Sequence, residues 1–222
     1  HQPRRLPKGG RIDRARPFRF AFDGRDLEGY AGDTLASALL ANDVHLVGRS
    51  FKYHRPRGVF SAGAEEANAL LQIGTGGRSE PNQKAPQIEL YDGLFAESQN
   101  RLPSLRFDAT AINDLLAPLL PAGFYYKTFM WPTGLWMRYE RAIRAMAGMG
   151  RAAREADPDR YDQTNAHCDV LIAGGGPAGL MAALAAGRAG ARVILADEQN
   201  EFGGRLLAES AEAESIGGKP AA

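Results

Sequence analysis

The chain has almost no cysteine, almost no net charge and no long apolar run. Its 222 residues include a single cysteine, Cys168, so no disulfide can form within the chain. The formal net charge of +1 gives no global attraction to nucleic acid or to a membrane surface. No stretch approaches the roughly 20 apolar residues of a membrane-spanning helix, and the first residues lack the apolar core of a signal peptide. These absences predict a protein of the reducing cytoplasm that binds neither nucleic acid nor membrane.

A glycine-rich turn between apolar segments is the most informative feature that is present. The motif is Gly174-x-Gly176-x-x-Gly179, and it directly follows the apolar residues 170–173. An Ala- and Leu-rich segment, residues 180–187, comes after it and is expected to be a helix. A strand, a glycine turn and a helix in this order are typical of the start of a dinucleotide-binding βαβ unit.

A second apolar run and an acidic residue complete the predicted unit. Residues 191–196 indicate another buried strand, and Asp197 follows it, 18 residues after the last motif glycine. A carboxylate at this distance accepts hydrogen bonds from the ribose of a dinucleotide, and it disfavours the 2′-phosphate of NADP. NAD or FAD is therefore expected, and a glycine-rich turn without a ligand is the alternative.

The expected cofactor contacts come from the turn and from segments after the second strand. The N–H groups at the start of the helix are expected to face the pyrophosphate, because the helix dipole favours negative charge there. A later Phe-Gly-Gly-Arg segment offers a second bare backbone and a counter-charge. The residues predicted on these grounds are Gly174, Gly176, Gly179, Asp197, Glu198, Gln199, Gly204 and Arg205. No set of residues indicates a catalytic centre or a metal site.

The chain is predicted to have four parts. Residues 1–16 are a basic segment, expected to be a solvated tail, and residues 17–106 a small α+β domain. Residues 107–165 are a helical connecting segment, and residues 166–222 the first part of a dinucleotide-binding domain. The chain begins with a histidine and ends soon after one βαβ unit, so we expect it to be a fragment of a longer protein.

Two predicted hairpins around one short helix define the α+β domain. Alternating phenylalanines in residues 18–22 predict a half-buried strand, and an Asp-Gly turn leads to the returning strand, residues 25–30. An Asp-Thr pair is expected to cap a helix over Leu35–Ala41. Residues 88–91 and 94–96 predict a second hairpin. The fold class predicted for the chain is a ferredoxin-like β-grasp module followed by a partial Rossmann-type α/β domain.

The segments that carry a family resemblance are residues 50–58, 92–94 with 98–100, 122–132 and 174–179. In this order they resemble the amino-terminal part of the alpha subunits of heterotetrameric sarcosine oxidases. An aromatic segment ending in Trp131-Pro132 is the most specific of them. Related amine and amino-acid dehydrogenase subunits share this plan.

The resemblance implies a first domain built like a 2Fe-2S ferredoxin module. Iron–sulfur clusters are held by cysteine thiolates, and the corresponding loop, residues 60–69, contains no cysteine. We therefore expect a module without an iron–sulfur cluster, kept for assembly. The resemblance also implies NAD in the glycine-rich domain, near Ala178, Asp197, Glu198, Gln199 and Arg205, with FAD and FMN elsewhere in the assembled enzyme.

The activity implied by the resemblance is the oxidative demethylation of sarcosine to glycine. Folate would accept the one-carbon unit, and O2 would be reduced to hydrogen peroxide. The amine and folate sites would lie outside this chain, in a heterotetramer with beta, gamma and delta subunits. Two alternatives stay open: the alpha subunit of a related amino-acid or amine dehydrogenase, and a non-enzymatic assembly module.

Overall fold

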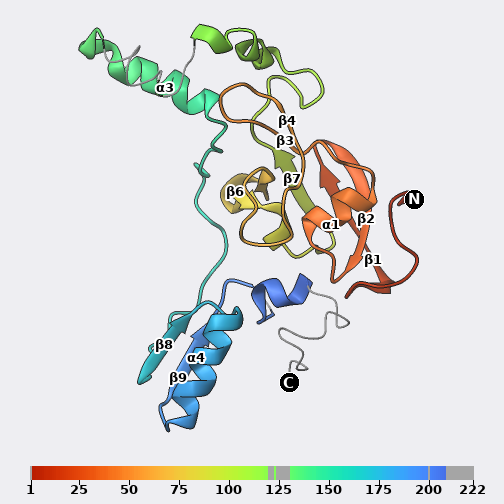
Figure 1. The fold of residues 1–222 in the computed structure, drawn as a ribbon, viewed down its shortest axis with the longest axis vertical. Helices are drawn as coiled ribbons and strands as arrows, with labels where there is room; N and C mark the ends of the chain where they lie inside the picture. Colours follow the sequence, from red (N-terminus) through yellow and green to blue (C-terminus); the bar gives the residue numbers. More distant parts are fainter. Residues whose placement is uncertain (1, 120–122, 124–130, 200, 209–222) are drawn as a thin grey trace. The chain divides into compact units, whose positions relative to one another are not determined.

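The structure, a computed structural model, describes residues 2–119, 123, 131–199 and 201–208 (Figure 1). The chain divides into two compact units. The first comprises residues 1–61 and 65–159, and the second comprises residues 62–64 and 160–222. None of the helices in the described part of the chain is both long enough and apolar enough to span a membrane.

The first unit begins with the predicted hairpin and helix. β1 (Asp13–Phe22) pairs antiparallel with β2 (Arg25–Ala31), and the helix α1 (Leu35–Ala41) follows. Thr34 is the N-cap of α1: its side chain accepts a hydrogen bond from the N–H of Ser37 at 3.2 Å, while Ser37 Oγ accepts from the N–H of Thr34 at 3.0 Å. The strand alternation and the cap predicted from the sequence are both confirmed.

A five-stranded sheet in the order β2-β1-β7-β5-β6 forms the body of this unit. β7 runs parallel to β1 and antiparallel to β5, and β5 pairs antiparallel with β6. Two very short strands form a separate pair, and two 3-10 helices lie beside β6 in the sequence. The bounds are β3 (Gly48–Arg49), β4 (Pro56–Arg57), β5 (Leu70–Ile73), η1 (Gly76–Arg78), β6 (Glu80–Lys84), η2 (Ala85–Gln87) and β7 (Leu94–Ser98).

The predicted second hairpin is wrong. Residues 88–91 form no regular strand, and the partners of β7 are β1 and β5. Residues 88–91 instead bond to the start of α1: the carbonyl of Ile88 accepts from the N–H of Leu35 at 2.8 Å, and the N–H of Leu90 donates to the carbonyl of Asp33 at 2.8 Å. Tertiary hydrogen bonds to α1 therefore replace the local pairing that the Asp-Gly turn suggested, and the hairpin formed by β5 and β6 was missed.

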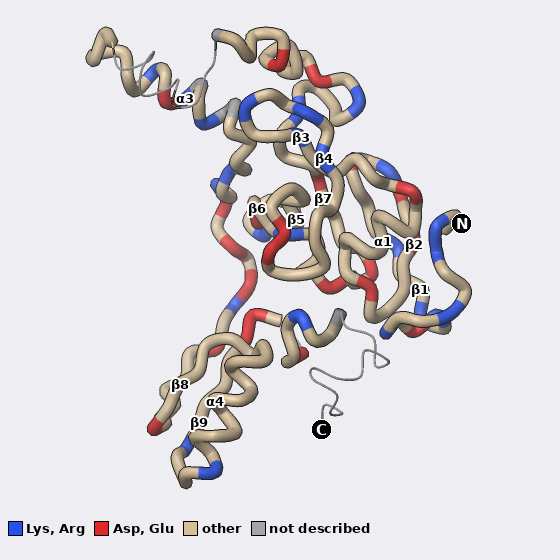
Figure 2. Tube along the Cα trace, viewed as in Figure 1, with Lys and Arg blue, Asp and Glu red and all other residues tan. Residues whose placement is uncertain are grey.

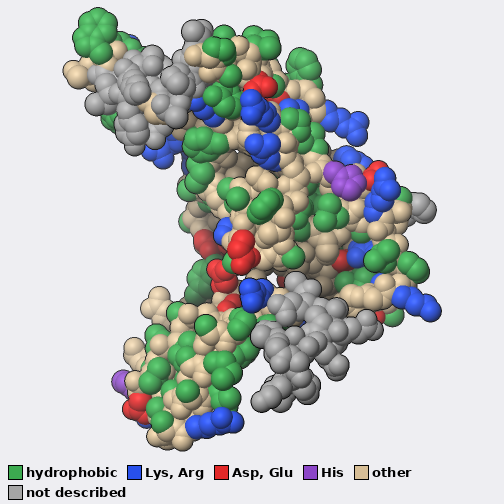
Figure 3. All heavy atoms as spheres, in the orientation of Figure 1, with side chains coloured by type: hydrophobic (Ala, Val, Ile, Leu, Met, Phe, Trp, Pro, Cys, Tyr) green, Lys and Arg blue, Asp and Glu red, His purple; other side chains and the backbone are tan. Residues whose placement is uncertain are grey.

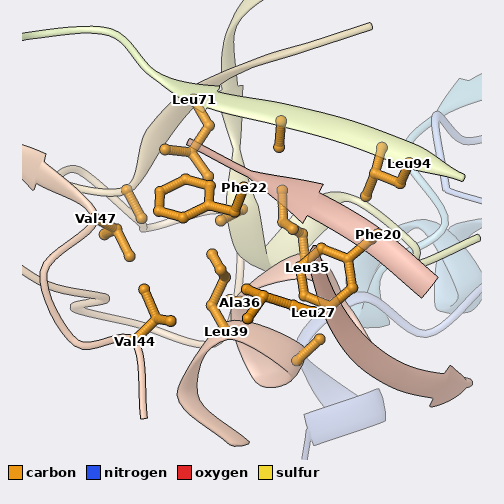
Figure 4. Close-up of a cluster of buried hydrophobic side chains, with 14 of the residues drawn as sticks. Phe20, Phe22, Leu27, Leu35, Ala36, Leu39, Val44, Val47, Leu71 and Leu94 are labelled. Carbon is orange, nitrogen blue, oxygen red and sulfur yellow. The ribbon is translucent and has the colours of Figure 1, made fainter. Parts of the chain in front are cut away.

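The core of the first unit lies between α1 and the sheet (Figure 4). Phe20 and Phe22 are each 3% exposed, as their alternate positions in β1 predict. Leu35 and Leu39 of α1 meet them from the opposite side. The side chains that are almost completely buried include Leu35, Leu39, Val47, Leu71, Leu90 and Leu94. This closed apolar cluster packs α1 against β1, β2, β5 and β7.

The amino-terminal segment differs from the expected solvated tail. The guanidinium of Arg5 donates to both carboxylate oxygens of Asp33, at 2.8 and 2.6 Å, and the side chain of Asp33 is completely buried. Arg5 also lies over the ring of Tyr30, 5.3 Å from its centroid. Figure 2 shows the basic positions along this segment, and β1 already begins at Asp13. Part of the basic segment is therefore an anchored component of the first unit.

The region between residues 102 and 159 carries short helical elements. They are η3 (Ala109–Asp114), η4 (Ala117–Leu119), η5 (Thr133–Leu135) and the helix α3 (Trp136–Met146). Most of residues 122–132, the most specific segment of the family resemblance, lies outside the described residues.

The second unit contains the predicted strand–helix–strand arrangement. β8 (Val170–Ala173) pairs in parallel with β9 (Val193–Ala196), and α4 (Pro177–Arg188) connects them. A 3-10 helix, η6 (Gly204–Ala208), follows. Unlike the first unit, β8, α4 and β9 contain no residue that is fully buried in the described structure. Figure 3 shows hydrophobic side chains at the surface of this unit.

Candidate dinucleotide-binding site

The glycine turn connects the end of β8 to the start of α4. Gly174 has a φ of +106°, in the region that favours glycine, and its N–H donates to the carbonyl of Ala196 in β9 at 2.7 Å. Gly176 is the N-cap residue of α4 and provides no side-chain cap. Pro177 occupies the first helical position, where its lack of an N–H costs nothing. The start of α4 therefore keeps backbone N–H groups available for an anion.

The three motif glycines meet different spatial requirements. A Cβ added at Gly179 would overlap the carbonyl oxygen of Gly174, so only glycine lets the helix approach the turn this closely. A Cβ added at Gly176 would have no heavy atom within 4 Å among the atoms of the described chain. The space beside Gly176 is therefore open to a group that is not part of the chain, which fits the close approach of a pyrophosphate.

Asp197 lies against the same turn. Its carboxylate accepts hydrogen bonds from the N–H of Gly175 and, at 2.8 Å, from the N–H of Gln199. These two N–H groups lower the pKa of Asp197 below its ordinary value, so the side chain is ionised at neutral pH. A carboxylate has about four acceptor positions on its two oxygens, so Asp197 keeps the capacity to accept from a ribose hydroxyl as well.

The segment after β9 folds back onto the turn. The N–H of Gly203 donates to the carbonyl of Gly175 at 2.8 Å, and a Cβ added at Gly204 would lie 3.1 Å from the Cα of Gly176. The ring of Phe202 covers Gly175 so closely that a Cβ there would overlap it. The structure thus brings the predicted second bare backbone to the glycine turn. The packing of Phe202 on Gly175 was missed, although the phenylalanine directly precedes the glycine pair.

The other predicted residues lie close to this turn in the sequence, and their side chains are exposed. Ala178 is exposed in the first turn of α4, and Glu198 is exposed directly after Asp197. Arg205 is exposed in η6, beside Gly204. The arrangement offers backbone donors for a diphosphate and an oriented carboxylate for a sugar. Within the described residues, no group of three or more His, Cys, Asp or Glu side chains is placed to hold a metal ion.

Family models match both units. Residues 15–101 match a model described as a 2Fe-2S iron-sulfur cluster binding domain, and residues 169–212 match a model described as FAD dependent oxidoreductase. The chain therefore carries a ferredoxin-type domain followed by the start of an FAD-dependent oxidoreductase domain, in a mixed α/β architecture.

The chain is similar over nearly its whole length to alpha subunits of sarcosine oxidases. It is 62% identical to sarcosine oxidase subunit alpha from Rhizobium meliloti, over 98% of this chain and 22% of that protein. It is 36% identical to the corresponding subunit from Corynebacterium sp. strain U-96, over 92% of this chain and 17% of that protein. The resemblance predicted from the sequence motifs is confirmed, and the chain spans about a fifth of the length of these relatives.

A solved structure, that of L-proline dehydrogenase from P. horikoshii, is also similar. The two chains share 21% identity, and the match covers 90% of this chain and 27% of that one with a TM-score of 0.42. This score is too low to support a statement about function.

The two family models correct the cofactor predictions. The glycine-rich unit, for which NAD was predicted, matches a family that depends on FAD. The first domain, for which no iron–sulfur cluster was predicted, matches a family described as cluster-binding. The glycine fingerprint is shared by NAD and FAD proteins, so the motif alone had no power to separate them.

The residues of the chain fit these two groups unequally. The open space beside Gly176 and the oriented carboxylate of Asp197 fit the diphosphate and ribose of FAD. Residues 15–101 contain no cysteine, and Cys168 is the only cysteine of the chain, so this domain supplies no thiolate to a cluster.

Proposed function

We propose that this chain is the amino-terminal, FAD-binding part of the alpha subunit of a sarcosine oxidase. The observation that carries the proposal is the 62% identity to such a subunit over 98% of the chain, which includes the open glycine turn. The family match of residues 169–212 supports FAD as the dinucleotide.

The finer fold assignment belongs to the same proposal. The mixed sheet β2-β1-β7-β5-β6 packed on α1 supports a ferredoxin-like β-grasp module. The parallel pair β8 and β9, joined through the glycine turn and α4, supports a partial Rossmann-type unit. The domain limits at residues 17–106 and 166–222 stay predictions.

The proposed contacts divide between the two ends of the adenosine diphosphate. The backbone at Gly174, Gly176, Ala178 and Gly179 would approach the pyrophosphate, with Gly204 and Arg205 beside it. Asp197 would accept hydrogen bonds from the ribose hydroxyls, and Glu198 and Gln199 would lie next to that sugar. When bound, FAD supplies the capacity to accept electrons from an amine. The chain contributes binding and orientation, and we assign it no catalytic residue.

The reaction proposed for the complete enzyme is oxidation of sarcosine to glycine. Folate accepts the one-carbon unit, and O2 is reduced to hydrogen peroxide, at sites outside this chain. The proposed partners are the beta, gamma and delta subunits of a heterotetramer, and a cytoplasmic location stays a prediction.

A matched pair of glycine substitutions tests the nucleotide site. Gly176→Ala places a methyl group in the space that the pyrophosphate would occupy, whereas Gly187→Ala places it in open space within α4. Both positions accept a Cβ without a clash in the described structure, so both variants are expected to fold. In a titration of FAD into the complete alpha subunit, followed by flavin fluorescence, we expect Gly176→Ala to weaken binding roughly tenfold or more. Equal affinities for the two variants would contradict the site.

The activity requires a separate test. The complete alpha subunit should be purified with its natural partner subunits and assayed for sarcosine-dependent formation of hydrogen peroxide. Peroxide formed with another secondary amine but not with sarcosine would favour a related amine-oxidising enzyme. FAD binding without any amine-dependent oxidation would reject the oxidase and leave the nucleotide site intact.

A further inference from the structure

Glu66 is a buried acid within a loop that has no regular secondary structure. Glu66 is only 2% exposed, and it lies in the loop of residues 60–69, between β4 and β5. A buried carboxylate is unfavourable unless hydrogen bonds compensate for the lost water. The buried carboxylate of Glu66 therefore requires hydrogen-bond donors from the residues around it.

Four backbone N–H groups of the loop converge on this carboxylate. One oxygen, Oε2, accepts from the N–H of Phe60 at 2.7 Å and from that of Ser61 at 2.9 Å. The other, Oε1, accepts from the N–H of Asn68 at 2.6 Å and from that of Ala69 at 3.0 Å. Each oxygen thus binds one side of the loop, and the carboxylate joins the two sides.

The polarity of this arrangement is that of an anion site. Several backbone N–H groups aimed at one point create a positive potential without any basic side chain. Burial by itself raises the pKa of Glu66, but the four N–H groups lower it, and the net direction is downward. The carboxylate is therefore charged at neutral pH, and the loop provides its compensation.

The loop also determines where β5 starts. Ala69 is fully buried, and its carbonyl accepts from the N–H of Ala85 at 3.0 Å, directly before Leu70 pairs with Lys84. The N–H of the same residue donates to Glu66. Ala69 therefore connects the carboxylate of Glu66 to the residue at which the β5–β6 pairing begins.

We propose that residues 60–69 form an anion-binding loop whose occupant is the carboxylate of Glu66, and that small carboxylates take its place when this side chain is removed. The loop folds around a negative charge that the chain itself supplies. Its chemical preference is for a planar carboxylate with two oxygens, because the four donors are divided in pairs between two acceptor atoms. The proposed role of Glu66 is structural positioning, and this inference does not rest on the proposed nucleotide site.

Hydrogen exchange of the four loop amides provides the direct test. In the 222-residue chain, Glu66→Ala is expected to speed exchange at the N–H groups of Phe60, Ser61, Asn68 and Ala69 by at least roughly tenfold, because they lose their acceptor. The matched control is Glu65→Ala, which removes the neighbouring exposed acid and should leave the four amides unchanged. Wild-type protection of these amides in Glu66→Ala would overturn the proposal.

Sodium formate tests whether a free carboxylate can replace the side chain that Glu66→Ala removes. The melting temperature of Glu66→Ala should rise in a saturable way with formate, measured against sodium chloride of the same ionic strength. The wild-type chain and Glu65→Ala should respond to the two salts equally. Identical responses of Glu66→Ala to formate and chloride would overturn the proposal.

A neutral variant of the same size decides the matter if Glu66→Ala does not fold. Glu66→Gln keeps one carbonyl oxygen but turns an NH2 group toward two of the four donors. Two of the four amides should then lose protection while the other two keep it. Wild-type protection at all four amides in Glu66→Gln would show that the charge and its second oxygen are not needed.

Discussion

The two units of the chain bury their apolar side chains to different extents. In the first unit, Leu35, Leu39, Leu71 and Leu94 are completely buried between α1 and the sheet. In the second, Leu171 and Met181 remain 66% and 63% exposed, respectively, although β8, α4 and β9 adopt the arrangement that the sequence predicts. The predicted local structure is therefore present in both units, but among the residues that the structure describes the closed core belongs to the first.

The difference follows from the architecture of each unit. The mixed sheet of the first unit buries its inner face with one helix and a few loops that the same unit supplies. Parallel strands connected through a helix are normally covered on both faces, and β8 and β9 form a sheet of only two strands. Within the described residues, the second unit therefore leaves apolar side chains of β8 and α4 exposed, whereas the first buries its own between α1 and the sheet.

Removal of the buried acid at the amino-terminal anchor should have the largest effect on this comparison. Asp33→Ala takes away the acceptor of Arg5, Tyr30 and Ser37, and leaves the guanidinium of Arg5 without its carboxylate partner. We expect the free energy of unfolding of the first unit to fall by about 4 kcal/mol. Urea denaturation followed by circular dichroism measures this loss. The control Asp169→Ala, at an exposed ion pair of the second unit, should change stability by less than about 1 kcal/mol.

A core truncation compares the packing of the two units directly. Leu39→Ala opens a cavity against the sheet, and we expect a loss of about 3 kcal/mol. Leu184→Ala removes the same atoms from α4, where the side chain is 45% exposed, and should cost less than about 1 kcal/mol. The two variants are compared in the same urea titration. Equal losses would mean that the second unit has a core of comparable density, contrary to its exposure.

Acid should weaken the first unit through its buried carboxylates. Thr110 and His54 donate to Asp108 and lower its pKa, although burial raises it, and the loop amides lower that of Glu66. A lowered pKa in the folded state gives stability that is present above the pKa of the unfolded chain and lost as pH falls through the folded value. We expect a loss on the order of 1 kcal/mol or more below about pH 4. Asp108→Asn should flatten this pH dependence, and a slope equal to that of the wild type would contradict the assignment.

Exposed ion pairs should matter least in both units. Arg144 donates to Glu140 at 2.8 Å on α3, and Arg192 lies 3.7 Å from Asp169 before β9. Solvent screening makes each pair worth about 0.5 kcal/mol or less, so Arg144→Ala and Arg192→Ala should both leave the unfolding midpoint nearly unchanged. Thermal unfolding in low and in high salt checks this. A marked loss in one unit alone would show that surface charge, and not packing, separates the two.

Sequence reasoning succeeded where neighbouring residues decide the structure. The phenylalanine alternation of β1, the threonine cap of α1 and the glycine turn before α4 all depend on contacts within a few residues. It failed for residues 88–91, because their backbone hydrogen bonds are made to residues at the start of α1, which precede them by more than 50 positions in the sequence. The roles of the nucleotide-site residues stay predictions, because contact with a ligand is a property of the bound complex.

Local sequence also left two other features undecided: the identity of the cofactor and the buried ionic contacts of the first unit. A Gly-x-Gly-x-x-Gly turn follows from glycine stereochemistry, and NAD and FAD present it with the same diphosphate. The amino-terminal arginines gave no local signal for the buried pair of Arg5 with Asp33, and the loop sequence gave none for the four amides on Glu66. In each of these contacts, a buried carboxylate is compensated by groups that only the folded chain brings next to it.

By itself, the sequence determined the β1–β2 hairpin, the short capped helix, the strand–glycine–helix–strand unit and the similarity to sarcosine oxidase alpha subunits. Only the tertiary structure decided that β7 lies parallel to β1, that Arg5 is anchored and that Glu66 closes its loop. The reason is physical: turns, caps and strand alternation are set by short-range sterics and hydrogen bonds. The pairing of distant strands and the compensation of buried charges depend on which remote groups meet when the core closes.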